Sequence, residues 1–277
     1  MELKSKFARV MYYVICSFVA IIFIFPLYYT FINSLRDIFS LPATLLPKGF
    51  HWENWEMAFT LIPFMRFLGN SLIILAISIP IGIVTNFTYG YALAKLRAPG
   101  SDFIFSLVLC IMMIPTFATQ IPQYILFSKL GITNTWWIWV FEAIAGTPYI
   151  IFLCRQYLNS IPSALMEAAT IDGCNQWQLI SKMAIPMSKP LVAIVAFRLF
   201  NLHWGDYMTP YMYLSREKWP LIMALFNTSL YVLPGTNTRP APVVNAAALV
   251  LAIPTIILFF LCQKQLQQGS VASGIKG

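Results

Sequence analysis

Charged residues are scarce in this sequence. Lys and Arg together number 18 and Asp and Glu number 10 among 277 residues, so 10% of the chain is charged, against about 25% in ordinary soluble domains. Hydrophobic residues make up 59% of the chain, and its mean hydropathy is +0.72. So few charges cannot cover the surface of a water-soluble fold. The composition therefore excludes a soluble domain and predicts a membrane protein.

Residues that carry metal, redox or nucleotide chemistry are also few. The two histidines, His51 and His203, have no carboxylate cluster beside them, which argues against a metal site. The five cysteines form no pair at metal or redox spacing. The sequence has no G-x-x-x-x-G-K-[ST] motif, so it cannot hold ATP by a P-loop. We therefore expect no cofactor in this chain and no enzyme activity.

The net charge of +8 does not indicate a nucleic-acid partner, because the Lys and Arg residues are scattered between apolar runs. Such residues fix the topology of membrane segments instead. Ten Lys and Arg residues lie in segments on the same side of the membrane as the chain termini, and seven lie in segments on the opposite side. This distribution favours both termini in the cytoplasm. The first apolar stretch is too long for the core of a signal peptide, so we expect it to be an uncleaved span.

The apolar runs predict an all-α protein, since a helix needs about 20 residues to cross the hydrocarbon core. A cytoplasmic N-terminus (1–11) precedes a six-span domain (12–264), and a cytoplasmic tail follows (265–277). The tail has three glycines and no apolar run, so we do not expect it to pack as a helix against lipid. The spans are predicted at about 12–34, 68–93, 103–127, 136–155, 190–212 and 243–263.

The longest predicted cytoplasmic loop, residues 156–189, has the composition of two short helices around a turn. It contains in order helix formers, a turn pair, a capping residue and a helix stop: Glu167, Ala168, Ala169, Asp172, Gly173, Asn175 and Pro186. Its apolar residues would face water, namely Leu165, Ile171, Trp177, Leu179 and Ile180. Either the end of the protein's own helix bundle or a partner protein must cover them.

The loop also resembles a known motif. Glu167-Ala168-Ala169, three residues, Gly173, nine residues and Met183-Ala184-Ile185-Pro186 are similar to the EAA loop of binding-protein-dependent ABC importers. Met183 and Ile185 replace residues of similar volume in that pattern. Other stretches resemble the carbohydrate-uptake branch, in particular its shorter six-span subunit of the maltose-importer type: Phe25-Pro26, Asn33-Ser34, residues 91–97, residues 130–135, residues 204–207 and the tail.

This resemblance implies a type I ABC importer permease in a bacterial inner membrane. The partners it implies are a second homologous permease, two ATPase subunits that hold ATP and Mg²⁺, an extracellular sugar-binding protein and a carbohydrate substrate. The loop would be the coupling helix that docks on one ATPase. The residues expected at that contact are Glu167, Ala168, Ala169, Asp172, Gly173, Trp177, Ile185 and Pro186.

Polar residues inside predicted spans are candidates for the substrate path, because they are costly in lipid. They are Asn201, Trp204, Asp206 and Tyr207 in the fifth span, with Asn86 and Tyr89 in the second and Gln123 and Tyr124 in the third as weaker candidates. The alternative is that this face of the fifth span packs on another helix, with Arg198 bonded to Glu142. We predict that these two charges are neighbours, since each would otherwise be uncompensated.

Two other functions are compatible with some of these residues. An ion-driven carrier could use Arg198, Glu142 and Asp206 as a proton relay, although the loop would then have no role. A membrane enzyme is less well supported, because no nucleophile and base, metal cluster or paired carboxylates stand out in the sequence.

Overall fold

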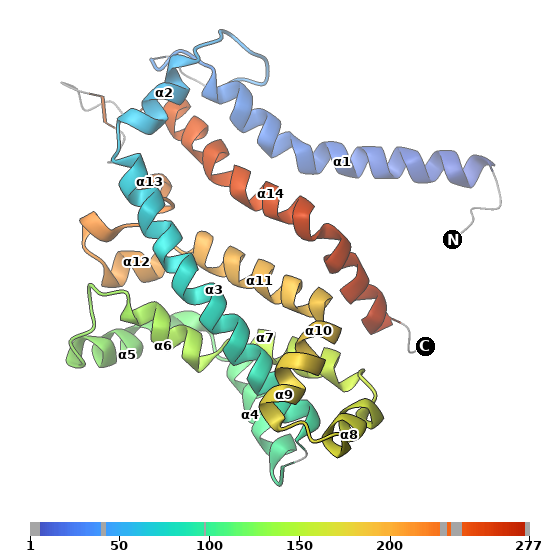
Figure 1. The fold of residues 1–277 in the computed structure, drawn as a ribbon. Coiled ribbons are helices and arrows are strands. Elements are labelled where there is room, and N and C mark those ends of the chain that lie inside the picture. Colours follow the sequence, from blue (N-terminus) through green and yellow to red (C-terminus); the bar gives the residue numbers. More distant parts are fainter. Residues whose placement is uncertain (1–5, 40–42, 97, 228–231, 234–239, 275–277) are drawn as a thin grey trace. The chain divides into compact units, whose positions relative to one another are not determined.

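The computed structural model describes residues 6–39, 43–96, 98–227, 232–233 and 240–274 (Figure 1). Every regular element within these ranges is a helix. The elements are α1 Lys6–Ser34, α2 Glu53–Thr60, α3 Phe64–Lys95, α4 Ser101–Met112, α5 Thr116–Lys129, α6 Trp137–Ala145, α7 Pro148–Asn159, α8 Ser163–Ile171, α9 Gln176–Gln178, the π-helical turn η1 Leu179–Ala184, α10 Ile185–Met187, α11 Lys189–Trp204, α12 Met208–Tyr213, the 3₁₀ turn η2 Arg216–Lys218, α13 Met223–Phe226 and α14 Ala241–Gly274.

Three helices, α1, α3 and α14, are long and apolar enough to cross a membrane. Three bent pairs bring the number to six if each pair is one span: α4 with α5 at 100°, α6 with α7 at 40°, and Gln176–Met187 with α11 at 87°. The predicted third span, 103–127, is therefore not one straight helix. It breaks before Pro115, which lacks an N–H to continue the backbone ladder.

The predicted tail also differs from expectation. Helix α14 continues without a break from its apolar part through Gly274, so most of residues 265–277 are helical. The three glycines argued against a helix here. Extending an existing helix by one residue, however, costs less free energy than starting a new helix. The cytoplasmic position of the tail stays a prediction.

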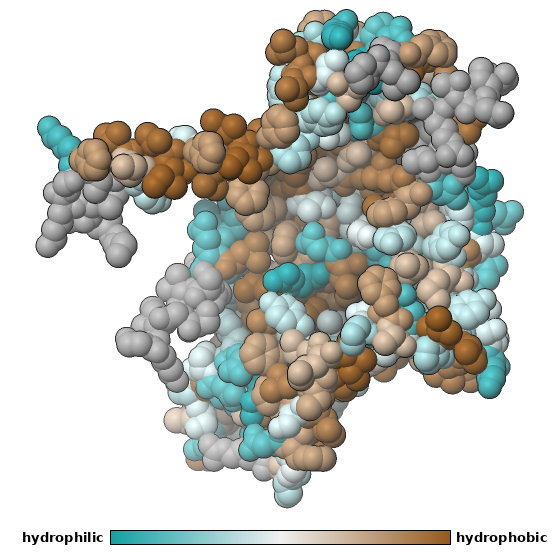
Figure 2. Space-filling view, turned by 180° about the vertical axis from the view of Figure 1, so that it is seen from behind, coloured by the Kyte–Doolittle hydropathy of each residue, from teal (hydrophilic) through white to brown (hydrophobic). Residues whose placement is uncertain are grey.

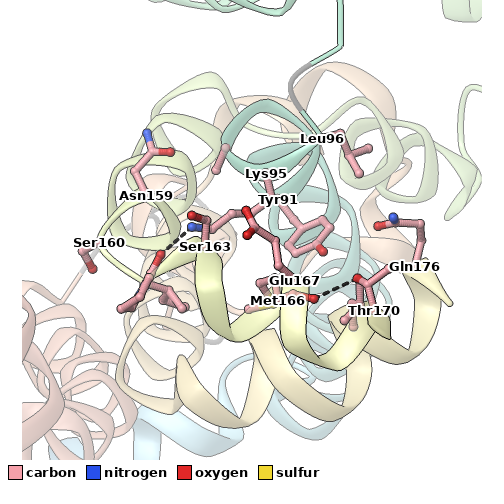
Figure 3. Close-up of a pocket in the computed structure, with 14 residues that line it drawn as sticks. Tyr91, Lys95, Leu96, Asn159, Ser160, Ser163, Met166, Glu167, Thr170 and Gln176 are labelled. Atoms are coloured by element: carbon pink, nitrogen blue, oxygen red, sulfur yellow. Dashed lines mark hydrogen bonds between the residues drawn. The ribbon is translucent and has the colours of Figure 1, made fainter. Parts of the chain in front are cut away.

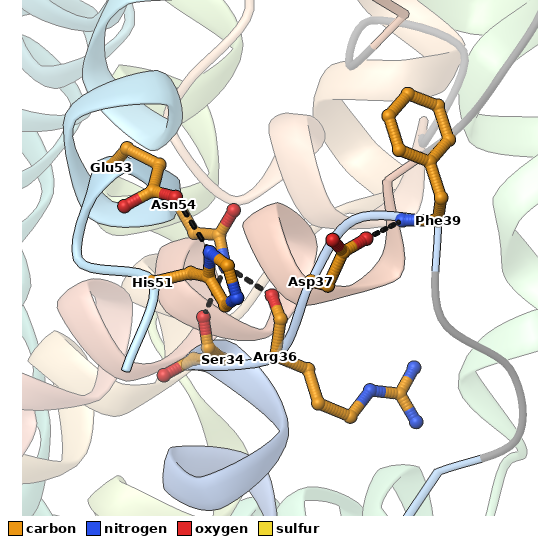
Figure 4. A network of polar contacts seen from close by, with 7 residues as sticks. All are labelled: Ser34, Arg36, Asp37, Phe39, His51, Glu53 and Asn54. Carbon is orange, nitrogen blue, oxygen red and sulfur yellow. Dashed lines mark hydrogen bonds and ion pairs between the residues drawn. The ribbon is translucent and has the colours of Figure 1, made fainter. Parts of the chain in front are cut away.

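The chain divides into two compact units, and each is described by itself. Unit 1 comprises residues 1–65 and 223–254. In it, the buried Asn54 donates through Nδ2 to the backbone oxygens of Ser34 (2.8 Å) and Arg36 (2.7 Å), which fastens α2 to the end of α1 (Figure 4). Beside it, the pKa of Glu53 is held below its ordinary value by its own backbone N–H and by His51, whose Nδ1 lies 2.7 Å from the carboxylate.

Helix α1 exposes large apolar side chains along most of its length, from Phe7 to Phe31. Figure 2 shows mostly apolar side chains along the face of this helix that is in view. A helix that is apolar on all sides is suited to contact with lipid or with other membrane helices.

Unit 2 comprises residues 66–222 and 255–277 and has a continuous apolar core. Side chains from α3, α7, α8, η1 and α11 meet there, among them Phe87, Leu158, Leu179 and Leu199. Gly90 permits α3 and α7 to touch, because a Cβ atom at this position would lie 2.3 Å from that of Cys154. This core supports the helices of the 156–189 loop described next.

Candidate functional site

The 156–189 loop folds as the predicted helix-turn-helix. Helix α8 follows Pro162 and ends at Ile171, and Gly173 then takes a left-handed φ of +88°. Asn175 and Gln178 form a capping box in which each side-chain oxygen accepts from the other residue's backbone N–H at 2.9 Å. The predicted turn and cap are therefore confirmed.

The helix that begins at Gln176 ends at Met187, one residue after Pro186, which is the predicted stop. The chain then bends by 87° at Ser188, before α11 begins at Lys189.

The apolar residues of the loop divide into two sets. Leu179 and Ile180 are buried in the core of unit 2, together with Met166 and Ala169, so the protein's own helices cover them, which is one of the two alternatives given above. The capped second helix turns these two side chains toward α3 and α7 of the same unit. Leu165, Ile171 and Trp177 remain exposed, with 87% of Ile171 and 69% of Trp177 accessible.

The other predicted coupling residues follow the same division. Ala169 is buried beneath the loop. The exposed set is Glu167, Ala168, Asp172, Gly173, Ile185 and Pro186. The loop therefore has a side fixed to the core and an open side that carries Ile171 and Trp177.

A cavity of about 560 Å³ lies between the end of α3 and the loop (Figure 3). Lys95 donates through Nζ to the backbone oxygen of Ile161 at 2.6 Å, which ties α3 to the turn before α8. Glu167 lines this cavity on the side of α8 that faces Lys95. The glutamate of the EAA pattern is therefore exposed and lies at the edge of this cavity.

Asn86 and Tyr89, two of the substrate-path candidates, have structural partners. Asn86 is buried, accepts from the backbone N–H of Thr147 at 2.7 Å and donates to Gly82 at 2.6 Å. Tyr89 donates its hydroxyl to the backbone oxygen of Ile144 at 3.0 Å. Both therefore hold the break between α6 and α7, where backbone groups have lost their helical partners.

The fifth-span candidates are also engaged with their own segment. Asn201 donates to the backbone oxygen of Phe197 at 2.8 Å, and the buried Trp204 stacks on Phe200. Asp206 accepts from the backbone N–H groups of Met208 (3.0 Å) and Thr209 (3.1 Å), so it caps α12. Tyr207 is half-buried beside it.

We predicted that Arg198 and Glu142 pair directly or through water, and each side chain has a different direct partner in the structure. Arg198 is exposed on α11 and donates to the hydroxyl of Tyr149 at 3.3 Å. The carboxylate of Glu142 accepts a hydrogen bond from the side-chain amide of Gln123 on α5 at 3.3 Å.

The sequence did not single out Tyr213. Its side chain is buried, and its hydroxyl has no hydrogen-bond partner among the described residues. The ring of Tyr213 contacts that of Tyr124, with centroids 5.5 Å apart. The two tyrosines are 89 positions apart in the chain, and no local pattern connects them.

Comparison with known proteins agrees with the EAA pattern. The family model described as "Binding-protein-dependent transport system inner membrane component" matches residues 78–269. The galactooligosaccharides transport permease GanQ of Bacillus subtilis (strain 168) is 29% identical, over 98% of this chain and 97% of the relative. The arabinooligosaccharides transport permease AraQ of Halalkalibacterium halodurans is 30% identical, over 94% of each.

Solved structures show the same fold. A chain of a bacterial ABC transporter that imports the acidic polysaccharide alginate superposes with a TM-score of 0.80 at 22% identity, over 95% of this chain and 99% of the other. A chain of the MetNI methionine ABC transporter gives a TM-score of 0.55 at 18% identity, over 74% and 95%. The fold of this chain is therefore that of a type I ABC importer permease.

Proposed function

The chain belongs to the family of binding-protein-dependent transport system inner membrane components, and we propose that it is the permease subunit of an ATP-driven importer of sugars or oligosaccharides. It is a multi-pass inner-membrane protein and a non-enzymatic transport subunit, and members of such complexes work with ATPase partners. Hydrolysis of ATP then takes place on those partners, where ATP and Mg²⁺ bind.

The observation that carries the proposal is the exposed apolar pair on the EAA loop (residues 156–189). Ile171 and Trp177 flank the Gly173 turn and lie in the open, while the same loop is fixed to the core through Leu179 and Met166. Exposed aromatic and aliphatic side chains on a rigid support are typical of protein contact sites. A rigid loop passes the movement of a bound ATPase to α11 as a rigid-body displacement.

The proposed complex contains this chain, a second homologous permease, two ATPase subunits and an extracellular binding protein that delivers substrate. Both termini and the EAA loop are then cytoplasmic, as the distribution of Lys and Arg favours. The names of the relatives, which refer to galactooligosaccharides, arabinooligosaccharides and maltodextrin, support a saccharide as the substrate. The residues proposed along its path are Asn86, Tyr89, Gln123, Tyr124, Asn201, Trp204, Asp206 and Tyr207.

Uptake of radiolabelled oligosaccharides by cells that express the complete complex tests the proposal. ATP depletion should abolish uptake, and collapse of the proton gradient with ATP maintained should leave it intact. The ionisable residues Arg198, Glu142 and Asp206 within the predicted spans favour one rival, an ion-driven carrier. Uptake that follows the proton gradient rather than ATP would support that rival and refute the importer.

A further inference from the structure

An open groove with a volume of about 380 Å³ lies within unit 2, between α3, the start of α6 and η2. This tryptophan groove is lined by Ile77, Thr135, Trp136, Trp137, Val140 and Lys218. The hydroxyl of Thr135 donates to the backbone oxygen of Ile132, so it is engaged within its own turn. The groove therefore has mostly apolar walls and one charged residue, Lys218.

The tryptophan groove lies at one end of a membrane span. Helices α6 and α7 form a bent pair that together is long and apolar enough to cross a membrane. Trp137 is the first residue of α6, whereas α7 ends at Asn159 in the EAA loop. Tryptophan is enriched at the boundary between membrane and water, and 58% of Trp137 is exposed. The groove therefore begins at the membrane boundary opposite the EAA loop.

The lining of the groove also extends into the membrane. Ile77 lies in α3, nine residues inside the predicted span 68–93. At 1.5 Å per residue, Ile77 is about 14 Å from the start of that span along the helix axis. Half of the hydrocarbon core of a bilayer measures about 15 Å. The lining therefore reaches from the membrane boundary almost to the middle of the bilayer.

Two contacts fix the position of the charged residue. Lys218 donates through Nζ to the backbone oxygen of Asn134 at 2.6 Å, and Nζ lies 6.0 Å from the centre of the Trp136 ring. A lysine ammonium group has three N–H donors, and the bond to Asn134 uses one. The same turn, η2, carries Arg216 and Glu217, which are exposed and do not line the groove. The groove therefore has a positive charge beside Trp136, at its boundary end.

The chemistry of the groove selects a phospholipid over a sugar. A sugar needs partners for several hydroxyl groups, because a polar group buried without a hydrogen bond costs free energy. Walls of Ile, Val and Trp offer few such partners, whereas they make dispersion contacts with an acyl chain. A lysine at the membrane surface attracts anionic headgroups. Phosphatidylglycerol has a net negative charge, while the ammonium group of phosphatidylethanolamine opposes the charge of the lysine.

We infer that the tryptophan groove binds an anionic phospholipid of the leaflet opposite the EAA loop. The headgroup phosphate pairs with Lys218, and an acyl chain lies along Trp137, Val140 and Ile77. The inference goes beyond the proposed function, since it requires that the chain lies in a membrane and does not depend on which substrate is carried.

Photo-labelling with lipid probes tests the site. The complete complex is reconstituted in nanodiscs of phosphatidylethanolamine that contain a trace of phosphatidylglycerol or phosphatidylethanolamine with a diazirine on one acyl chain. After illumination, mass spectrometry measures the label on residues 135–137. The phosphatidylglycerol probe should label this segment about fivefold more than the phosphatidylethanolamine probe, the factor expected for one lysine at a membrane surface.

Matched variants separate the headgroup contact from general charge. Lys218→Gln should bring the preference for phosphatidylglycerol close to one, and Lys218→Arg should keep it. Arg216→Gln removes a positive charge from the same turn but outside the lining, so it should keep the wild-type preference.

A second pair of variants tests the acyl-chain contact and leaves the bond from Lys218 to Asn134 in place. Val140→Phe narrows the groove and should lower labelling by both probes at least fivefold. Ile144→Phe adds the same ring at an exposed position of α6 outside the lining, so it should label as the wild type does.

Three results would overturn the inference. They are equal labelling of the wild type by the two probes, an unchanged preference in Lys218→Gln, and unchanged labelling in Val140→Phe. A photo-cross-linking amino acid at position 137 that reacts with the second permease or with the binding protein, and not with lipid, would also refute it, because a protein would then cover the groove. None of these results bears on the importer, which fails only if saccharide uptake does not depend on ATP.

Discussion

The two ends of unit 2 differ in the contacts that dominate them. At one end, the EAA loop is fixed by apolar packing of Leu179, Met166 and Ala169 against α3, α7 and α11. At the other end, the outer clasp, defined here as Asn70, Ser71 and Asn134, joins distant segments by side-chain hydrogen bonds to backbone groups. Packing is not directional, whereas hydrogen bonds fix both register and orientation.

The outer clasp is specific in its contacts. Asn70 donates to the backbone oxygens of Glu217 and Trp219, each at 3.0 Å. Ser71 accepts from the backbone N–H of Leu221 at 2.8 Å. Asn134 accepts from Ser215 through both its backbone N–H (3.1 Å) and its hydroxyl (3.0 Å). The clasp therefore keeps its end in one geometry, while the EAA loop leaves Ile171 and Trp177 open for a partner.

The largest expected effect comes from the packing beneath the EAA loop. Leu179→Ala should destabilise the loop by about 2 to 5 kcal/mol, because it leaves a cavity in the core. The complex should then lose its ATPase subunits and melt at lower temperature, as measured by thermal unfolding and co-purification. Leu165→Ala, at an exposed position of the same loop, should change the melting temperature little.

The exposed aromatic residue at the same end should act on association without affecting folding. Trp177→Ala should weaken binding of the ATPase by about 30-fold, a value typical of a central aromatic contact of about 2 kcal/mol. Titration of the ATPase onto the purified permease pair measures this. Trp137→Ala removes a similarly exposed tryptophan from the start of α6 and should leave ATPase binding unchanged. Equal losses in both variants would remove the distinction between the two ends.

A matched pair of glycines compares the ends directly. Gly173 and Gly131 have φ of +88° and +68°, and a Cβ atom at either would meet no neighbour within 4 Å. Substitution by Val should therefore cost about 1 to 2 kcal/mol at each, from backbone strain alone. Gly173→Val should reduce ATPase co-purification and transport of every sugar together. Gly131→Val should leave ATPase co-purification intact, and the opposite ranking would refute the assignment of the EAA loop.

The smallest effect is expected at the outer clasp. Asn134→Gly keeps the left-handed backbone (φ +57°) but removes the oxygen that accepts from Ser215, which should cost about 1 kcal/mol. Uptake that depends on the binding protein should fall, while ATPase association stays at the wild-type level. Asn134→Ala adds backbone strain and should be more severe in the same assay. A loss of ATPase binding in Asn134→Gly would show that the two ends are not independent.

Local signals in the sequence predicted the EAA loop well. The Gly173 turn and the Asn175 cap each depend on neighbours within three residues, so composition and spacing were sufficient. Which apolar residues would be buried was not predictable in this way. Leu179 is covered by side chains of α3 and α7, and its own segment gives no sign of that.

Long-range contacts explain the other failures. Asn70 and Glu217 are 147 positions apart, and no periodicity connects them. Arg198 and Glu142 were expected to pair because both are charges in spans, but Tyr149 and Gln123 lie nearer to them. Depth along a span follows from the sequence, whereas the direction in which a side chain points depends on how the helices pack.

The central claim is that Ile171 lies at the contact with an ATPase subunit. Incorporation of a photo-cross-linking amino acid at position 171 of the complete complex, followed by illumination and mass spectrometry, tests it most directly, with position 131 as the matched site at the other end. We predict an ATPase cross-link from position 171 and none from position 131. Cross-links from position 171 only to lipid or to the permease subunits, with the complex intact, would contradict the account.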